Sequence, residues 1–275
     1  MSRRKQHVPW NAAGAASEGQ HSADDVVRAT GWVFNNQTGE HLDLAEFVRT
    51  GDHETLAYLQ AFDLAGPQNE DQTLVEIGSG IGRMTSSFTR LFAKVIACDL
   101  DGAFLERCRE TVAQFGRPER LQTSHVEDGH TLQIPGDSAD LTFSYITLQH
   151  CHPDDALGLA REAVRVTRPG GHVALNFRTW SGSDFVLWPT GKIVRAMFRL
   201  PGIGPAMARQ RVTARFGWQA NRLAPDQVLA AVSPGLSGIR IVRAPNRPAF
   251  RLGDVTQSTF EGVNHSHWWL IAQVT

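Results

Sequence analysis

A short apolar run that ends in closely spaced glycines is the feature that most constrains how this chain folds. The run reads Val75-Glu76-Ile77-Gly78-Ser79-Gly80-Ile81-Gly82, and a helical pattern follows it over residues 83–92. Glycines at the end of a strand let the backbone turn sharply and pass close to a ligand that no Cβ would tolerate. The free N–H groups at the start of the next helix then point at that ligand. This unit predicts a nucleotide site, although any tight turn between a strand and a helix also favours glycine.

Strand and helix patterns alternate after this turn. Further strands are predicted over residues 94–98, 124–127, 141–145, 172–177, 239–242 and 268–274. Apolar residues at helical spacing predict one helix between Asp101, its cap, and Gly116, and another over residues 154–166. The last two strands leave no room for a long helix between them and therefore predict a hairpin. The fold class is α/β: a doubly wound, mostly parallel, seven-stranded sheet with a terminal antiparallel strand and helices on both faces.

Composition and charge exclude several classes of protein. The formal net charge is −1 over 275 residues, so no overall field recruits nucleic acid or an anionic membrane. The sequence has no recognised nucleic-acid module, no apolar run of roughly 20 residues, and no apolar segment after Arg3-Arg4-Lys5 that would make a secretory signal. The three cysteines cannot form a disulfide framework. We therefore expect a cytoplasmic protein without stable membrane insertion.

Two acidic residues narrow the choice of ligand at the glycine turn. Asp99 ends the second strand about 20 residues after Gly78, where a carboxylate can accept hydrogen bonds from both ribose hydroxyls of an adenosine cofactor. Alone, Asp99 would be interpreted as an exposed acid at a strand end. Glu76 precedes the first glycine and would repel a pyrophosphate but could hold a cationic ammonium group. The spacing G-x-G-x-G also differs from the dinucleotide pattern G-x-G-x-x-G, which disfavours a nicotinamide oxidoreductase.

Five sequence blocks, in this order, resemble the small-molecule branch of the class I S-adenosylmethionine (SAM)-dependent methyltransferases. The resemblance covers residues 73–177 closely and the terminal strands loosely. The blocks are Val75-Glu76-Ile77-Gly78-Ser79-Gly80-Ile81-Gly82-Arg83, Val95-Ile96-Ala97-Cys98-Asp99-Leu100-Asp101, Glu127-Asp128-Gly129, Ala139-Asp140-Leu141 with Leu148-Gln149-His150, and Arg165-Val166-Thr167-Arg168-Pro169-Gly170-Gly171.

The resemblance implies SAM as cofactor, S-adenosylhomocysteine as product, and a set of cofactor-binding residues. Glu76 would lie near the amino group of SAM and Asp99 would hold the ribose. Asp128 would accept from the adenine amino group, unless neighbouring Glu127 is the acid in register. Tyr145 would lie near the sulfonium. The full set is Glu76, Gly78, Ser79, Gly80, Gly82, Arg83, Asp99, Leu100, Asp128, Gly129, Ser144 and Tyr145.

Histidines just past the fourth strand are the candidate catalytic groups. Methyl transfer is an in-line displacement that depends on positioning and desolvation, and a hydroxyl acceptor also has to lose its proton. His150 is the first candidate base and His152 the second. The alternative interpretation is that His150 closes its turn by hydrogen bonding. The pair His265 and His267 is a further candidate, interpreted as structural or exposed.

A metal ion is not expected at this site. His150, His152, Asp154 and Asp155 are close in sequence, but the run crosses from a loop into a helix, so these side chains are not expected to converge on one ion. The two aspartates are better placed to supply negative charge at the first turn of that helix.

Residues 178–223 interrupt the alternation after the fifth strand, where open α/β sheets bind ligands, and predict a helical lid over the acceptor.

We assign residues 1–70 to an N-terminal arm with helices, broken near Gly51. Residues 71–275, which include this lid, are assigned to a Rossmann-like methyltransferase domain. Tryptophans in the lid suit sugar or aromatic faces, while Trp268 and Trp269 face opposite sides of the last strand. An apolar stripe over 193–198 predicts an amphipathic lid helix. The lid has one acidic residue, Asp184, and many more basic ones. The basic residues are Arg178, Lys192, Arg195, Arg199, Arg209, Arg211, Arg215 and Arg222.

The sequence therefore predicts a small-molecule O-methyltransferase with a polyhydroxylated or saccharide acceptor. The basic lid could instead attract an anionic acceptor, or settle on a membrane surface. Two other functions stay open: an N- or C-methyltransferase of a metabolite or lipid, and a SAM-binding regulatory subunit without catalysis. A homo-oligomer is compatible with the sequence, which does not determine the oligomeric state.

Overall fold

The computed structural model describes residues 22–34, 42–198, 200–208, 221–243 and 266–275. Their strands form one seven-stranded sheet in the order β3-β2-β1-β4-β5-β7-β6. The strands are β1 (Thr73–Ile77), β2 (Lys94–Asp99), β3 (Leu121–His125), β4 (Ala139–Ser144), β5 (Thr167–Arg178), β6 (Leu236–Arg243) and β7 (His267–Val274). β1 to β5 pair in parallel, whereas β7 runs antiparallel to both of its neighbours. The predicted fold class and the terminal antiparallel strand are confirmed.

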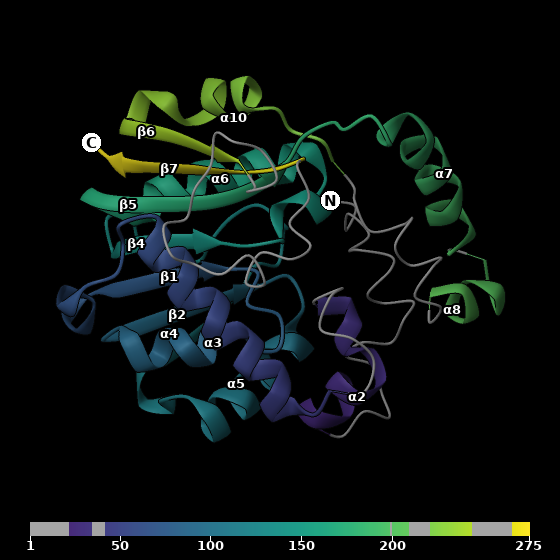
Figure 1. Cartoon of the computed structure of the whole chain (residues 1–275), viewed down its shortest axis with the longest axis horizontal. Coiled ribbons are helices and arrows are strands. Elements are labelled where there is room, and N and C mark those ends of the chain that lie inside the picture. The colour runs from purple at the N-terminus through teal and green to yellow at the C-terminus, as the bar shows by residue number, and fades with distance from the viewer. Residues whose placement is uncertain (1–21, 35–41, 199, 209–220, 244–265) are drawn as a thin grey trace.

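Helices cover both faces of this sheet (Figure 1). One face carries α3 (Leu44–Ala61), α4 (Thr85–Leu91) and α5 (Gly102–Phe115), with α2 (Ala23–Phe34) packed on α3 and α5. The other face carries α6 (Pro153–Val166) and α10 (Pro225–Val232). Figure 1 shows α7 (Asp184–Met197) and α8 (Ile203–Ala208) beside the sheet, beyond the carboxyl ends of the central strands. Short 3-10 helices span Pro67–Asp71, Pro118–Arg120, Leu148–His150 and Ser233–Gly235.

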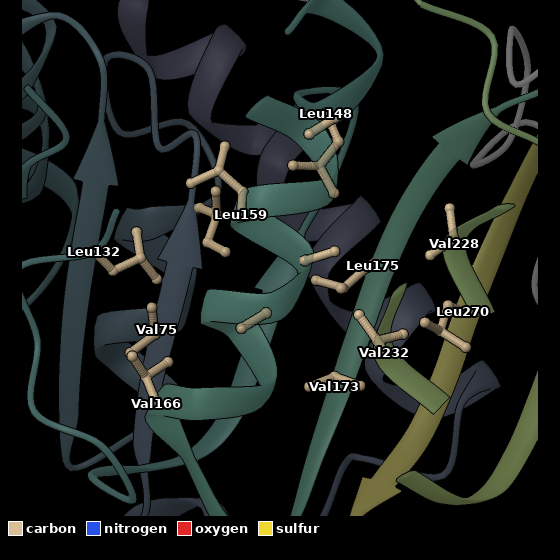
Figure 2. Close-up of a cluster of buried hydrophobic side chains, with 14 of the residues drawn as sticks. Val75, Leu132, Leu148, Leu159, Val166, Val173, Leu175, Val228, Val232 and Leu270 are labelled. Atoms are coloured by element: carbon tan, nitrogen blue, oxygen red, sulfur yellow. The ribbon is translucent and has the colours of Figure 1, made fainter. Parts of the chain in front are cut away.

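Alternation along the strands divides the core into two layers. Val75 and Ile77 face α6, within the apolar cluster that Figure 2 shows between α6, α10 and the sheet. Leu74 faces α3 and α4 on the other side. Trp268 belongs to the α6 layer and Trp269 to the α3 layer, so the prediction that they face opposite sides is confirmed.

The prediction of two short helices broken near Gly51 is wrong. α3 runs without a break from Leu44 to Ala61, and its start is fixed by reciprocal hydrogen bonds between Asp43 and Glu46. A glycine inside a helix disfavours it by roughly 1 kcal/mol relative to alanine. Here a Cβ on Gly51 would overlap the Arg83 carbonyl oxygen, so the glycine allows α3 to approach the turn after β1.

Two boundaries also differ from the sequence prediction. β3 covers Leu121–His125 instead of 124–127, because its register with β2 runs from Val95↔Leu121 to Asp99↔His125. α4 begins at Thr85, since the residues directly after the glycines form a turn. In the part of the chain that the structure describes, no helix is long and apolar enough to cross a membrane.

Candidate functional site

A cavity of about 140 Å³ opens at the carboxyl ends of β1, β2 and β4. Its walls include most of the residues predicted from sequence: Glu76, Gly78, Ser79, Gly80, Arg83, Asp99, Leu100, Tyr145 and His150. The structure brings these residues together because parallel strands end at one edge of the sheet. The other predicted residues, Gly82, Asp128, Gly129, Ser144 and His152, do not line this cavity.

The turn after β1 holds its shape through backbone hydrogen bonds and left-handed glycines, of which Gly78 is the most constrained. The N–H groups of Gly78 and Ser79 donate to the Cys98 carbonyl at 2.8 and 3.1 Å, which joins the turn to β2. Gly78 has φ +83°, and a Cβ there would overlap the Thr147 side chain. Only glycine satisfies both the left-handed backbone and the close approach to Thr147.

Glu76 places a buried carboxylate in the cavity wall. Its Oε2 accepts a hydrogen bond of 2.6 Å from the Thr85 hydroxyl of α4. Burial raises the pKa of Glu76 to about 7, although the Thr85 bond and the nearby Arg83 charge oppose that rise. A carboxylate that ionises this reluctantly is stabilised by any cation that enters the cavity beside it.

Asp99 carries the second carboxylate of the cavity wall, which is partly buried. Its Oδ2 accepts from the Gly80 N–H at 2.9 Å, and its Oδ1 accepts from the Asp101 N–H at 3.0 Å. Burial raises the pKa of Asp99 to about 6, although these two N–H groups oppose the rise. Each carboxylate oxygen has a second lone pair, so Asp99 keeps acceptor capacity for ligand hydroxyls.

Arg83 connects the glycine turn to α3. Its Nη2 lies 2.6 Å from Glu54 Oε2, its Nη1 donates to the Thr50 hydroxyl at 3.2 Å, and its Cζ lies 5.9 Å from the centre of the Phe47 ring. Both partners of the ion pair are largely buried, with side chains 9% and 13% exposed. Arg83 therefore fixes α3 across the cavity and lines it mainly with the stem of its side chain.

Asp128, Gly129 and Ser144 lie near the cavity without forming its wall. Asp128 Oδ1 accepts from the N–H groups of His130 and Thr131, which closes the turn after β3. A Cβ on Gly129 would lie 3.7 Å from the Leu100 side chain, so this turn reaches the rim of the cavity. The Ser144 hydroxyl is buried and donates to the Ile77 carbonyl at 3.0 Å, joining β4 to β1.

The candidate histidines occupy different environments. His150 is buried in the cavity wall, with Nε2 3.2 Å from the Gln149 side-chain amide nitrogen. The His152 side chain is 64% exposed and lies 3.7 Å from Asp154. His265 is outside the described residues. Among the residues described, no three His, Cys, Asp or Glu side chains converge in a way that could hold a metal ion.

His267 is buried in β7, which agrees with a structural residue, the first of the two interpretations offered from sequence. Its Nδ1 lies 3.3 Å from Asn176 Oδ1. The Asn176 amide nitrogen donates to the Trp268 carbonyl, so Oδ1 is the acceptor and His267 Nδ1 carries the proton. Burial, together with the charges of Arg178, His150 and Arg222, lowers the pKa of His267 to about 3. His267 is therefore neutral above that pH, with a lone pair on Nε2.

Ile146 and Asn176 are site residues that the sequence analysis did not single out. Ile146 lines the cavity directly after Tyr145 and has φ +52°, an outlier for a β-branched residue. Its N–H donates to Asn176 Oδ1 at 3.3 Å, which holds the strained turn. A polar asparagine inside the apolar run 173–177 is the sequence signal that could have identified this position.

Aromatic rings form the wall between the cavity and the α3 layer of the core. The ring of Tyr145 stacks on Trp269 with centroids 5.5 Å apart and an interplanar angle of 8°. Tyr58 of α3 lies 4.9 Å from Tyr145 and 4.7 Å from Trp269 by ring centroids. This packing fixes the side chain of Tyr145 at the carboxyl end of β4.

Comparison with known proteins agrees with this geometry. A family model described as a methyltransferase domain matches residues 75–175. Carboxy-S-adenosyl-L-methionine synthase of Pseudomonas putida is 32% identical over 108 residues, which are 38% of this chain and 44% of that protein. Malonyl-(acyl-carrier protein) O-methyltransferase of Halorhodospira halophila is 35% identical over 102 residues, which are 36% of this chain and 32% of that protein. The chain thus spans less than half the length of these two relatives.

One solved structure extends the likeness to almost the whole chain. Magnesium protoporphyrin IX methyltransferase of Synechocystis, determined with bound S-adenosylhomocysteine, superposes with a TM-score of 0.56 and covers 92% of this chain and 98% of that one. At 14% identity this likeness shows the fold alone. The chain therefore shares the fold of this methyltransferase, and its residues 75–175 match the methyltransferase domain family.

Proposed function

We propose that the cavity binds SAM and that the protein transfers its methyl group to a hydroxyl of a small-molecule acceptor, releasing S-adenosylhomocysteine. One observation carries this proposal: two carboxylates, the buried Glu76 and the partly buried Asp99, line the same cavity beside the glycine turn. Their chemistry fits the cofactor, because one can pair with an ammonium group and the other can accept from ribose hydroxyls.

The residues of the cavity bind and orient the reactants. Glu76 pairs with the cationic amino group, and the turn at Gly78 lets the backbone pass close to the methionine portion. Asp99 accepts from the ribose, with Leu100 against the adenine. The turn that contains Asp128 and Gly129 closes the adenine end. Tyr145, held by Trp269, excludes water from the methyl-transfer end.

Proton removal from the acceptor is assigned to a histidine. When bound, SAM supplies an electrophilic methyl group, which the acceptor oxygen takes while the carbon–sulfur electron pair stays on sulfur. His150 lines the cavity and is the first candidate to accept the hydroxyl proton. His267 is the second, because its Nδ1 proton is held by Asn176 and its Nε2 keeps a lone pair, although its lowered pKa makes it the weaker base. His152, exposed to solvent and outside the cavity wall, is retained only as a control.

The lid is proposed to hold the acceptor over this cavity. Trp180 follows the end of β5 and Trp188 lies in α7, with their ring centroids 5.7 Å apart. Trp180 is 48% exposed. Such flat faces suit the C–H face of a sugar, which supports a polyhydroxylated or saccharide acceptor. The three buried, free cysteines fit a reducing compartment, and we place the protein in the cytoplasm.

A second candidate is N- or C-methylation of a metabolite or lipid. It is favoured by the contact between Gln149 and His150, since an amide that donates to His150 Nε2 occupies the lone pair that a base would need. An acceptor that is already nucleophilic needs no such base.

Calorimetric titration with SAM, and separately with NAD, tests the cofactor. We expect SAM to bind in the wild-type protein and in Asp71→Ala, an exposed acid at the opposite end of β1, and to bind at least tenfold more weakly in Asp99→Ala. Binding of NAD without SAM would overturn the proposal. A methyl-transfer assay across sugars, phenols and amines then decides between the two candidates, because turnover of amines alone would exclude O-methylation.

A further inference from the structure

Two arginines and one aspartate form a buried cluster where β5 leads into the lid. Arg178 is the last residue of β5, Asp184 the first of α7, and Arg222 lies shortly before α10. Asp184 Oδ1 accepts from Arg178 Nη2 at 3.0 Å and from Arg222 Nε and Nη2 at 3.0 and 2.8 Å. The side chains are only 2% exposed for Arg178, 0% for Asp184 and 5% for Arg222.

The cluster has more donors than acceptors. One carboxylate serves two guanidinium groups, and its other oxygen already accepts from the N–H and hydroxyl of Ser181. Arg178 Nε and Nη1 are fully buried and have no hydrogen-bond partner among the described residues. A buried donor without a partner disfavours folding, and a charged one disfavours it more. Such an arrangement indicates that a further anion completes the cluster.

The cluster lies on the same face of the sheet as the candidate site. Side chains opposite each other in antiparallel strands share a face, and here Arg178 pairs with His267 and Asn176 with Trp269. Trp269 stacks on Tyr145 of the cavity wall. Arg178 lies two residues beyond Asn176, which is about 6.6 Å along the strand. The two unpartnered donors of Arg178 therefore lie about two residues along β5 beyond Asn176, which holds the strained turn at Ile146.

We propose that Arg178 and Arg222 form an anion-binding subsite that takes a carboxylate or phosphate group of the acceptor. This rests on the proposed function, since it assigns the second substrate of the same site. A planar guanidinium is the side chain best suited to such groups, because its donors match their oxygens. An acid group held at Arg178 orients the rest of the acceptor along the face that carries Asn176 and His267, toward the cavity.

The first turn of α7 is the barrier to this subsite. Asp184 begins α7 and holds it against both arginines. An incoming acid group takes the free Nε and Nη1 donors of Arg178 and competes with Asp184 for the positive charge of the two guanidinium groups, so the subsite fills as this turn moves outward. The 81% exposure of Phe185, the next residue, shows that the turn has little packing to lose on its outer side. Asp184 is accordingly an internal substitute for the acid group of the acceptor.

The test is titration of the full-length protein with sodium acetate and, in a second arm, sodium phosphate, at ionic strength held constant with sodium chloride. The readout is the Nε–H resonance of Arg178 in protein labelled with nitrogen-15 at arginine. We expect a saturable shift with at least one of the two anions, and the arm that saturates at lower concentration identifies the acid group. Absence of a saturable shift with both anions would overturn the proposal.

Three variants make the test specific. Arg222→Gln removes one guanidinium and should weaken anion binding about tenfold or more, as expected for a hydrogen bond to a charged group. Asp184→Asn removes the competing carboxylate and should strengthen binding, a gain that a poorly folded variant would not show. Arg168→Gln, an exposed arginine paired with Asp140, should leave binding unchanged. Equal affinity in all three would show that the shift does not come from this cluster.

Titration with SAM on the same samples separates this inference from the proposed function. Anion binding that depends on Arg222 and Asp184 in a protein that does not bind SAM would support the subsite and refute the methyltransferase assignment. SAM binding without any dependence of anion binding on these residues would refute the subsite and leave the methyltransferase assignment in place.

Discussion

The carboxylate of Asp99 accepts a 2.9 Å hydrogen bond from the backbone N–H of Gly80, and this bond joins the end of β2 to the glycine turn after β1. One side chain therefore fixes the glycine turn beside the cavity and, in the proposed function, also presents acceptor capacity to the ribose of the cofactor. Because both functions use the same carboxylate, changes at Asp99 are expected to affect binding more than a single lost ligand contact would.

Replacement of Asp99 by asparagine keeps the shape of the side chain and removes its charge. The Gly80 and Asp101 N–H groups lose a charged acceptor, and each such bond contributes about 1.5–3 kcal/mol. We expect SAM to bind 10- to 100-fold more weakly, measured by calorimetry, with Asp71→Asn as control. Wild-type affinity in Asp99→Asn would show that Asp99 does not contact the cofactor.

Replacement of Glu76 by glutamine should weaken cofactor binding and raise the free energy of unfolding. The pKa of Glu76 is raised from 4.5 to about 7 in the folded protein, so the folded state holds a proton that the unfolded state has already released. The wild-type protein therefore loses stability as the pH rises from about 4.5 to 7. At pH 8 we expect Glu76→Gln to unfold with a free energy roughly 1–3 kcal/mol higher than the wild type.

Urea denaturation at pH 4 and pH 8 measures this effect. At pH 4 both side chains are neutral, so the two proteins should be equally stable. SAM binding should fall at least tenfold in Glu76→Gln at pH 8, because the amide cannot pair with an ammonium group. A variant that is less stable than the wild type at pH 8 would contradict the burial of an unpaired carboxylate.

Replacement of Gly78 by alanine should disrupt the turn. The residue has φ +83°, and its Cβ would overlap the Thr147 side chain. A left-handed backbone at a non-glycine residue costs about 1–2 kcal/mol before any clash is counted. We expect lower stability and at least tenfold weaker SAM binding. Gly102→Ala is the control, because Gly102 begins α5 and a Cβ there meets no atom within 4 Å. Loss of SAM binding in both variants would contradict a specific role of the Gly78 turn.

Replacement of Arg83 by methionine leaves Glu54 buried without its partner. Removing one member of a buried ion pair typically destabilises a protein by about 3–5 kcal/mol. We expect a large fall in the free energy of unfolding by urea, and a smaller fall when Glu54→Leu is added to Arg83→Met. The exposed pair Arg109–Glu106 is the control, since such pairs contribute about 1 kcal/mol or less. A stable single variant would show that α3 is held to the turn by other contacts.

Replacement of His150 by alanine tests proton removal. With a hydroxyl acceptor from the assay, we expect kcat to fall about 10²- to 10⁴-fold, the range of general base catalysis, while SAM affinity changes little. His152→Ala should keep wild-type kcat. His267→Asn tests the second candidate base and should lower kcat if His267 takes the proton. In that case the kcat of the wild-type protein should not fall between pH 5 and 8, because His267 is neutral throughout this range. Full activity in both His150→Ala and His267→Asn would favour nitrogen or carbon methylation.

Local patterns in the sequence were sufficient for the architecture and for the cofactor end of the site. Strand β1, the glycine turn and Asp99 at the end of β2 are close along the chain and joined by backbone geometry that glycine and strand alternation enforce. Their approach to one another follows from right-handed parallel crossovers, which admit few other arrangements. For the same reason the terminal hairpin and the opposite orientations of Trp268 and Trp269 could be predicted.

The acceptor end depended on contacts between distant segments, which no local pattern contains. The continuous α3 requires the approach of Gly51 to Arg83, and the ion pair of Arg83 with Glu54 turns a predicted cofactor ligand toward a helix. The tautomer of His267 depends on Asn176, 91 residues earlier. Sequence determined the strands, the glycine turn and the positions of the two acids beside it because these are set by neighbours along the chain. Tertiary structure alone decided which charges are buried and what faces them, because desolvation and pairing act between residues that only folding brings together.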